Sequence, residues 1–507
     1  MSQPAVSFFL EAVQSKARAV ISLTGLVAVL FIIKIIYNLY LHPLAKYPGP
    51  KLYAATPIPV SLAQLRGKLH AVTKSAHDQY GPVVRLSPNE LSFISAPAWQ
   101  DIYARRQGKP ALPRDRTFFN DMLVEPQTMT MANDTDHTRI RRSLNPAFSP
   151  RALLDQEPIL QKNVDLLMDK LQERAEQGLS TDLRAWYNYA TFDLIGDLAF
   201  GETFGCLSTS RFHEWVQMVL DYFFAATLLH VVHRFYPLNK ILAMLLPASV
   251  MKKKQRHSEM AIEKVHKRTD PQNAVERPDF IHHLMKAVSS KNITSSELDN
   301  QASILILAGS ETTSVTLTYI TYFLTQHPEV LEKLRAELQE NFKTESDIDL
   351  LSVNRLQYLQ AVVQESLRCR PPITNGFPRQ VPKDGAMVDG NFLPNGTVVN
   401  INHWAAYQSA SNFSQADEFI PDRWMGDARF DKDNKDVFQP FSVGPRNCIG
   451  QKFAYDSMKL ILSRMVWRFN LKLEEVSKKK ADWITGQLAF VSFHQPPLNV
   501  ELEVRSQ

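Results

Sequence analysis

The spacing of hydrophobic residues divides the chain into an apolar N-terminal stretch, a helical middle and a C-terminal part with short extended segments. Residues 19–41 are almost continuously apolar, and Lys34 is their only charged residue. As a helix, this stretch would be about 35 Å long, enough to cross a hydrocarbon core of about 30 Å. It is too long for a signal peptide, and no A-x-A cleavage site follows it. We therefore expect an uncleaved transmembrane anchor, with the side chain of Lys34 reaching the headgroups.

The segments around this anchor indicate how the chain is divided. Residues 1–18 form an N-terminal lead, and residues 42–52 contain three prolines and a glycine, which favour a stiff hinge over a helix. Residues 53–507 contain no Gly/Ser run, low-complexity block or internal repeat, so we expect a single large domain after the hinge. Basic residues on the two sides of the anchor nearly balance and leave its orientation open.

Hydrophobic residues recur with mostly helical periodicity over residues 151–370. Before and after this stretch, apolar and polar residues alternate, which predicts short strands. Alternation on both sides of a Ser-Pro-Asn turn predicts a hairpin over residues 82–94. After Pro371 the pattern changes to short extended segments, so we expect a mostly α fold with small, antiparallel β-sheets. The predicted helices span residues 151–177, 181–200, 213–232, 256–268, 295–326, 328–343 and 355–370.

Residues 218–250 form a second apolar tract, for which a second membrane span is the alternative. His230, His233 and Pro237 interrupt the tract, which favours two helices that form an apolar roof and dip towards lipid. The basic segment 251–256 that follows has two interpretations, a contact with anionic headgroups or a solvated helix face.

The predicted helix 295–326 is apolar on nearly all faces, so it should be buried, with Thr294 and Glu297 forming a capping box at its start. Its middle, AGSETT at 308–313, contains residues that are unfavourable inside a buried helix. Glycine costs about 1 kcal/mol relative to alanine there, and an unpaired buried carboxylate costs more. Two explanations stay open: threonine hydroxyls that bond to the preceding turn and bend the helix, or a local opening for water and proton transfer.

Composition narrows the possible functions. The chain of 507 residues has a net charge of +5 and a pI near 8.8, without an arginine-rich stripe or zinc-finger spacing, so we expect no nucleic-acid partner. Its three cysteines are far apart in sequence. That number suits a reducing compartment, which places the bulk of the chain in the cytosol.

One cysteine lies in an unusual turn. Cys448 belongs to FSVGPRNCIG, residues 441–450, and precedes a strongly patterned helix. The positive end of that helix and the charge of Arg446 favour thiolate, while Gly444 and Gly450 allow a flat partner to approach. The segment offers no base for a nucleophile and no second thiol for a redox pair. A single axial thiolate on the metal of a flat macrocycle agrees with all of these residues.

The same segment resembles the F-x-x-G-x-R-x-C-x-G haem-binding signature of the cytochrome P450 superfamily. QESLR at 364–368 resembles the E-x-x-R pair of that family, and AGSETT resembles its A-G-x-E/D-T-T motif. FIPDRW at 419–424 is similar to its P-E-R-F segment, from which Asp422 and Trp424 depart. The motifs occur in family order, and the resemblance covers about residues 45–500. It implies a cytochrome P450 fold behind a single N-terminal transmembrane helix.

The resemblance implies haem b, a thiolate-ligated iron protoporphyrin IX, as the cofactor. Cys448 would be the axial ligand of the haem iron, whose thiolate favours O–O cleavage. Glu311 and Thr312 resemble the acid–alcohol pair that supplies protons to the reaction. The remaining haem-binding positions implied by the family motifs are His137, Arg141, Arg379, Phe441, Arg446 and Gly450, where His137 stands in place of the usual tryptophan. Glu365, Arg368 and Arg423 resemble the buried ion-pair network that holds the cysteine loop.

The implied reaction is insertion of one oxygen atom from O2 into a small apolar substrate. The chain has no dinucleotide-binding motif, so electrons from NADPH would come through a separate, membrane-bound NADPH–cytochrome P450 reductase, docking near Arg139, Arg142 and Lys452. A haem-thiolate isomerase or dehydratase, a non-catalytic haem sensor, and a monooxygenase of xenobiotics or fatty acids are the alternatives. We expect a single-pass protein of the endoplasmic reticulum whose catalytic domain faces the cytosol.

Several segments resemble fungal enzymes of secondary metabolism, such as isotrichodermin hydroxylase-like members of the superfamily. This resemblance implies a terpenoid or polyketide intermediate as the substrate. The candidate walls of the substrate pocket are Phe118, Phe119, Met122, Leu123 and residues 304–309, 373–377 and 488–492.

Overall fold

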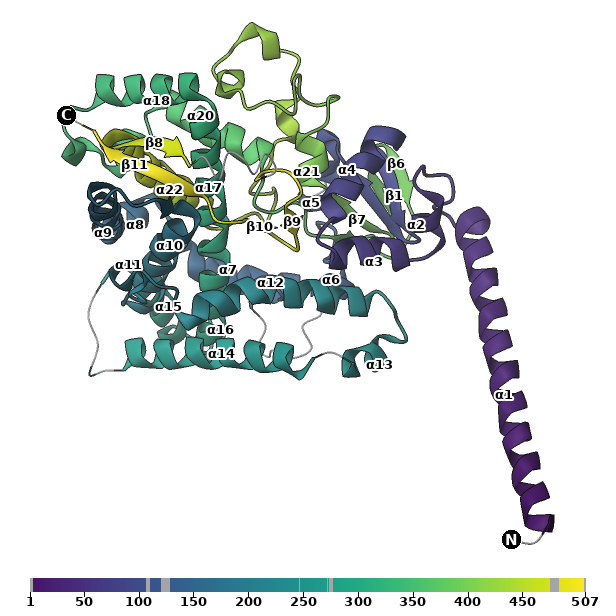
Figure 1. The fold of residues 1–507 in the computed structure, drawn as a ribbon. Coiled ribbons are helices and arrows are strands. Elements are labelled where there is room, and N and C mark those ends of the chain that lie inside the picture. The colour runs from purple at the N-terminus through teal and green to yellow at the C-terminus, as the bar shows by residue number, and fades with distance from the viewer. Residues whose placement is uncertain are drawn as a thin grey trace.

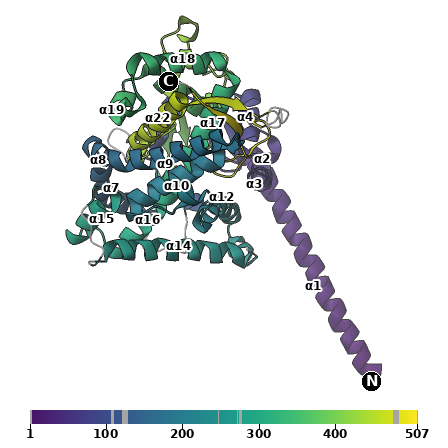
Figure 2. The same ribbon diagram turned by 60° about the vertical axis from the view of Figure 1, so that its left-hand side comes forward.

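A body built mostly of helices carries one long N-terminal helix that projects away from it (Figures 1 and 2). The computed structural model describes residues 3–105, 110–119, 128–245, 247–270, 272, 277–474 and 483–505. The projecting helix α1 spans Gln3–Ile36 and continues as a π-helix over Tyr37–Leu41. Its side chains from residue 15 to residue 34 are exposed, and Ser15–Leu41 is long and apolar enough to cross a membrane. The predicted anchor is therefore a candidate membrane span, within a helix that begins earlier than residue 19.

The segment after α1 is short and irregular. Residues 42–50 form turns, as the three prolines predict, but Lys51 already begins helix α2 (Lys51–Ala55). The predicted hinge is therefore two residues too long, because Pro50 is extended and serves as the N-terminal cap of α2. Helix α2 contacts the base of α1, and α3 (Ile58–Leu65) and α4 (Leu69–Tyr80) follow, α3 packing on α2 and α4 on α3 (Figure 1).

Four small sheets accompany the helices. The largest has the order β1-β2-β7-β4, and the predicted hairpin forms its β1 and β2 strands. The expectation of purely antiparallel sheets is wrong at one place, because β2 and β7 pair in parallel. Strands so far apart in sequence need no hairpin between them, so sequence alternation does not set their direction. The strands are β1 (Val83–Ser87), β2 (Glu90–Phe93), β3 (Thr181–Asp182), β4 (Arg379–Gln380), β5 (Ala386–Val388), β6 (Asn391–Leu393), β7 (Val398–Ile401), β8 (Phe469–Leu473), β9 (Leu488–Ala489), β10 (Phe493–His494) and β11 (Asn499–Val504).

Most of the predicted helices occur, with two differences. Residues 151–177 form two helices instead of one, because Pro158 lies at the start of α9, where its missing N–H is tolerated. The basic segment 251–256 lies inside a helix that begins at Ala248, before the predicted residue 256. The helices after α4 are α5 (Ala96–Tyr103), α6 (Arg116–Phe119), α7 (Asp134–Leu144), α8 (Pro150–Asp155), α9 (Glu157–Glu176), α10 (Leu183–Phe200), α11 (Cys206–Thr209), α12 (Glu214–His233), α13 (Asn239–Met244), α14 (Ala248–Thr269), α15 (Phe280–Ser289), α16 (Ser295–Gly309), α17 (Glu311–Gln326), α18 (Pro328–Asn341), α19 (Leu350–Val353), α20 (Gln357–Cys369), α21 (His403–Tyr407) and α22 (Gln451–Arg468).

The second apolar tract belongs to the body, as predicted. It forms α12 and α13, and α12 packs against α3 and α14. Trp215 on α12 is fully buried, and its indole Nε1 donates a 2.6 Å hydrogen bond to Nδ1 of His257 on α14. Length and composition alone would let α12 cross a membrane, but these contacts make it part of the packed body.

The long central helix is interrupted where its sequence predicts. It forms α16 and α17, separated at Ser310, and both segments pack against α10. Gly309 fits this packing, because a Cβ there would lie 2.7 Å from Cδ1 of Ile195 on α10. Thr294 and Glu297 form the predicted capping box at the start of α16. The interrupted helix therefore lies in the core, with its break deep in the body.

Candidate active site

Cys448 is the accessible thiol among the three cysteines. Cys206 and Cys369 are buried, whereas Cys448 is exposed. The Cys448 backbone N–H donates to the carbonyl of Phe441 at 2.9 Å, which closes the turn before α22. Gly444 has φ +79°, and a Cβ at this position would overlap the carbonyl of Tyr103 at the end of α5. Glycine is therefore required for the turn to lie against α5.

The expected stabilisation of the thiolate by Arg446 is not what the fold provides. Although Cys448 is exposed, the protein packed around its turn desolvates the sulfur and raises the pKa of Cys448, and the Gly450 backbone N–H and the charge of Arg141 only oppose that rise. Arg141 holds the turn through Asn447, with 2.6 Å to its carbonyl oxygen and 2.8 Å to its Oδ1. Arg446 instead bonds Asp134 Oδ1 at 2.7 Å and the Ala132 carbonyl. The protein alone thus favours the thiol, and a bound metal ion would have to displace its proton.

Several guanidinium groups converge beside this turn. Arg114 and Arg379 pair through a β-bridge, and the charges of Arg379 and Arg446 add to burial in lowering the pKa of Arg114. Burial lowers the pKa of Arg379 to about 10. Burial, Arg446, Arg114 and Arg141 lower the pKa of His137 to about 3, so this histidine is neutral at physiological pH. The fold therefore brings His137, Arg379 and Arg446 together, as predicted, and adds Arg114.

This cluster has the donors that an anionic group requires. Arg114 Nε and Nη1, Arg379 Nε and Arg446 Nη1 are buried and have no hydrogen-bond partner among the described residues. Unpaired buried charges are costly. The carboxylates of a haem group would supply the missing acceptors. The residues present therefore fit haem: the cluster would hold its carboxylates, and the exposed Cys448 beside it would ligate its iron.

Glu311 and Thr312 lie at the break between α16 and α17. Thr312 Oγ1 donates to the Ala308 carbonyl and Ser310 Oγ to the Ile306 carbonyl, both at 2.8 Å. Thr312 therefore bonds to the preceding turn as the first explanation of AGSETT expects, with Ser310 as the second hydroxyl. The helix is also interrupted at Ser310, while water and proton transfer at this break stays a prediction. Ala308 is exposed between the buried Leu307 and the half-buried Gly309, which places an open space at this point.

Glu311 is buried at this break. Burial raises its pKa to about 7, with the charge of Arg184 acting in the opposite direction. No hydrogen bond from the described residues offsets this rise. The group can therefore gain and lose a proton near neutral pH, which is the property that a proton donor needs.

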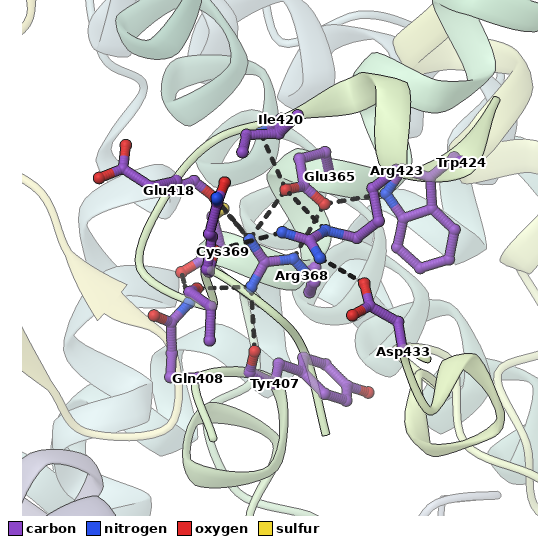
Figure 3. Close-up of polar contacts among 12 residues, drawn as sticks. Glu365, Arg368, Cys369, Tyr407, Gln408, Glu418, Ile420, Arg423, Trp424 and Asp433 are labelled. Carbon is purple, nitrogen blue, oxygen red and sulfur yellow. Dashed lines mark hydrogen bonds and ion pairs between the residues drawn. The ribbon is translucent and has the colours of Figure 1, made fainter. Parts of the chain in front are cut away.

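Glu365, Arg368 and Arg423 form a completely buried network, as Figure 3 shows. The Glu365 carboxylate accepts a bidentate pair of bonds from Arg368, at 2.8 Å and 2.9 Å. Arg423 Nε lies 3.4 Å from Glu365 Oε1, and its Nη1 bonds Asp433. Two positive and two negative groups thus balance one another.

The network ties distant loops to α20. Arg368 donates to the carbonyls of Tyr407, Ala416 and Glu418 at 3.0, 2.6 and 2.7 Å. The Ile420 backbone N–H donates to Glu365 at 2.9 Å. These bonds fix residues 407–420, which precede the cysteine turn in sequence. Their geometry supports the predicted structural role.

A cavity of about 490 Å³ contains part of the predicted substrate wall. Phe118, residues 375–377 and residues 489–491 line it, whereas residues 304–309 of the predicted wall are not among its lining residues. Phe119 packs against the rings of Phe118 and Phe377. Met122 and Leu123 lie outside the described residues.

Phe441, predicted beside the sulfur, packs on Tyr455 with ring centroids 5.1 Å apart.

Sequence reasoning missed Arg114, Asp433 and the role of Trp424. Trp424 was identified only as a departure from a motif, yet its Nε1 donates to Glu365 at 2.9 Å. The basic residues near the cysteine turn are also less free than expected. Arg139 pairs with Glu297 and Asp136, and Lys452 with Asp456.

Comparison with known proteins agrees with this arrangement. The Cytochrome P450 family model matches residues 50–502. Cytochrome P450 monooxygenase astD of Aspergillus oryzae is 60% identical over 93% of this chain and 91% of that protein. Cytochrome P450 monooxygenase astA of Talaromyces wortmannii is 39% identical over 93% of this chain and 94% of its own length. Trichothecene C-15 hydroxylase of Fusarium sporotrichioides is 38% identical, with coverages of 93% and 95%. The chain belongs to the cytochrome P450 family of haem-thiolate monooxygenases.

Proposed function

We propose that this protein inserts one oxygen atom from O2 into an apolar terpenoid or polyketide intermediate, with Cys448 as the haem ligand. The observation that carries the proposal is the position of the one accessible thiol beside a cluster of guanidinium groups whose buried N–H donors lack acceptors among the residues that the structure describes. Bound haem supplies the activation of dioxygen. Arg114, Arg379, Arg446 and the neutral His137 hold its carboxylates, and Arg141 holds the turn through Asn447.

Glu311 and Thr312 deliver protons to the reaction. A carboxyl group with a pKa of about 7 is partly protonated at neutral pH and is readily reloaded. The Thr312 hydroxyl is adjacent in sequence and donates to Ala308 at the opened turn. A helix closed by normal hydrogen bonds would leave less room for water at this place. The acid and the alcohol therefore form a pair that serves oxygenation.

Electrons come from NADPH through a separate reductase that binds near the cysteine turn. Among the three basic residues predicted there, Arg139 and Lys452 already have carboxylate partners. This leaves Arg142 as the first residue to test by charge reversal. Such a change should weaken binding of the reductase most at low salt, since salt screens exposed charges.

The substrate class rests on the relatives and on the cavity. One relative is named a trichothecene C-15 hydroxylase, and the others above are fungal monooxygenases. Aromatic side chains such as Phe118 and Phe377 line the cavity, which suits an apolar skeleton. A fungal secondary metabolite of the terpenoid or polyketide class agrees with both observations.

The protein is held at the endoplasmic reticulum membrane by residues 19–41, with residues 53–507 as the catalytic domain in the cytosol. Besides α1, the region around α13 offers apolar side chains to lipid: Tyr236 and Met244 are each 82% exposed, and Leu245 is 75% exposed. Basic residues at the start of α14, including Lys252, are exposed nearby. Apolar residues next to basic ones are typical of a helix that rests on a membrane surface.

Reconstitution with reductase and NADPH in membrane discs tests the proposal. Thr312→Ala should keep its haem but divert reducing equivalents to hydrogen peroxide, so that less product forms per NADPH consumed. Thr325→Ala, at the other end of α17, provides a control. Unchanged coupling in Thr312→Ala would contradict the proton-delivery role. Product formation from a peroxide substrate without NADPH would indicate a haem-thiolate isomerase instead.

A further inference from the structure

The cavity described above has a polar end at the base of the anchor. Phe31, Ile35 and Asn38 of the N-terminal helix line it together with Gln64 of α3 and Thr73 of α4. Figure 1 shows that α1 joins the body next to α2, and α2, α3 and α4 pack one against the next at this corner. His230 of α12 also lines the cavity, and its ring lies edge-on to Phe118, with centroids 4.8 Å apart. The polar end is therefore continuous with the aromatic wall.

Three of these side chains are buried with an unused oxygen atom. Asn38, Gln64 and Thr73 are only 3%, 5% and 1% exposed. Asn38 Oδ1, Gln64 Oε1 and Thr73 Oγ1 have no hydrogen-bond partner among the described residues. The amide nitrogens are engaged, Asn38 Nδ2 with the Ala55 carbonyl at 2.7 Å and Gln64 Nε2 with His230 Nδ1 at 2.9 Å. The free amide oxygens can only accept hydrogen bonds.

The charged residues of the cavity leave it close to neutral. Arg234 Nη1 pairs with Glu90 Oε2 at 2.7 Å, and Asn400 Nδ2 donates to Glu90 Oε1 at 3.2 Å. Asp115 also lines the cavity and accepts from Thr117 and Phe118, while the exposed Lys34 offsets its charge. Arg234 Nε has no partner among the described residues. The cavity therefore offers an anionic ligand no net attraction, whereas a neutral group that both donates and accepts would satisfy the free atoms.

We propose that this polar end, centred on Gln64, binds an alcohol group of the substrate, so that the enzyme acts on an apolar molecule that already carries a hydroxyl. The inference deepens the proposed function and rests on it. Water could occupy the same atoms, but a substrate hydroxyl would displace it and leave the skeleton against Phe118. The reaction that supplies the substrate must then install an alcohol, by an earlier oxygenation or by hydrolysis of an ester.

Binding of three matched probes tests this inference on the full-length, haem-loaded protein in membrane discs. The probes are radiolabelled farnesol, its methyl ether and the hydrocarbon farnesene, measured by equilibrium dialysis against empty discs. The ether keeps an acceptor but loses the donor that Gln64 and Asn38 require. We expect farnesol to bind about tenfold more tightly than either analogue, since one or two hydrogen bonds account for that ratio.

Substitutions of Gln64 and Thr73 test whether the polar atoms of these side chains cause the preference for farnesol. In Gln64→Met, farnesol should bind at most about twofold more tightly than the two analogues, while farnesene binds as in the wild type. Thr73→Val alters the side chain less and should reduce the preference for farnesol only in part. Phe118→Leu is the control and should weaken all three probes alike. Equal binding of farnesol and its ether, or an unchanged preference in both polar variants, would overturn the inference. A thiolate-type carbonyl spectrum in the same samples would show that haem ligation is intact even then, so that failure of this inference is distinguished from failure of the haem site on which the proposed function rests.

Discussion

The indole Nε1 of Trp424 donates a hydrogen bond to Oε2 of Glu365 across 2.9 Å, at the edge of a network in which Glu365 and Arg368 are fully buried. A phenylalanine, which the resembling P-E-R-F segment has at this position, could not make this bond. The departure from the motif therefore adds a donor to a buried carboxylate that already binds Arg368 and approaches Arg423.

Trp424→Phe should lower the free energy of unfolding by about 1–2 kcal/mol, because a bond to a charged group is lost. Urea denaturation followed by circular dichroism measures the change. Trp483→Phe is a matched control, since its Nε1 donates to the neutral Pro497 carbonyl at 3.0 Å and should contribute less. If Trp483→Phe lowers the free energy of unfolding as much as Trp424→Phe or more, the importance of the hydrogen bond from Trp424 to Glu365 is contradicted.

Glu365→Ala should be far more harmful, with a loss of about 3–5 kcal/mol, because it leaves Arg368 and Arg423 buried without this partner. We expect haem-free, aggregated protein. Glu365→Gln, which keeps the shape of the side chain, separates packing from charge. Normal haem content in Glu365→Ala would refute the structural role of the network.

Glu311 makes stability depend on pH in a defined direction. Its pKa is about 7 in the fold against an ordinary value of 4.5. The unfolded chain therefore releases the proton first, and the fold loses stability as the pH rises from 4.5 through 7. Each pKa unit corresponds to about 1.4 kcal/mol, so the loss approaches about 3 kcal/mol.

Glu311→Gln should remove this dependence. Its unfolding free energy should match that of the wild type at pH 5 and exceed it at pH 8. Turnover of the wild type should also fall above about pH 7, as the donor ionises. Parallel stability profiles for the two proteins would contradict the buried position of the acid.

Arg114→Met should act in opposite directions on the haem-free and haem-loaded protein. Without haem, the change removes a charge that lies near Arg379 and Arg446, so the fold should become more stable. With haem, it removes a donor to a carboxylate, so haem should transfer to apomyoglobin about tenfold faster. Arg429→Met, which affects an exposed pair with Asp427, should change neither quantity. Faster unfolding of haem-free Arg114→Met than of the haem-free wild type would contradict the clustering of Arg114 with Arg379 and Arg446.

The features that could be predicted are those that short sequence patterns encode. Helix α12 was placed to within one residue at each end, and the capping box of α16 was found, because periodicity and end signals are local. Glu365 and Arg368 are three residues apart on one helix, so their pairing also follows from sequence.

The remaining features depend on contacts between distant segments. Arg114 joins the cluster through a β-bridge to Arg379, and no pattern near Arg114 indicates it. Asp433 reaches Arg423 from an irregular loop. The pKa of Cys448 was predicted with the wrong sign for the protein alone, because its burial outweighs the local charges that the sequence displays.

The spectrum of the reduced carbon monoxide complex tests the central claim most directly. Purified wild-type protein should show the Soret band of a thiolate-ligated haem, and Cys448→Ser should lose that band, whereas Cys206→Ser should keep it. A wild-type protein that stays colourless when supplied with hemin, or a thiolate band that survives in Cys448→Ser, would contradict the account.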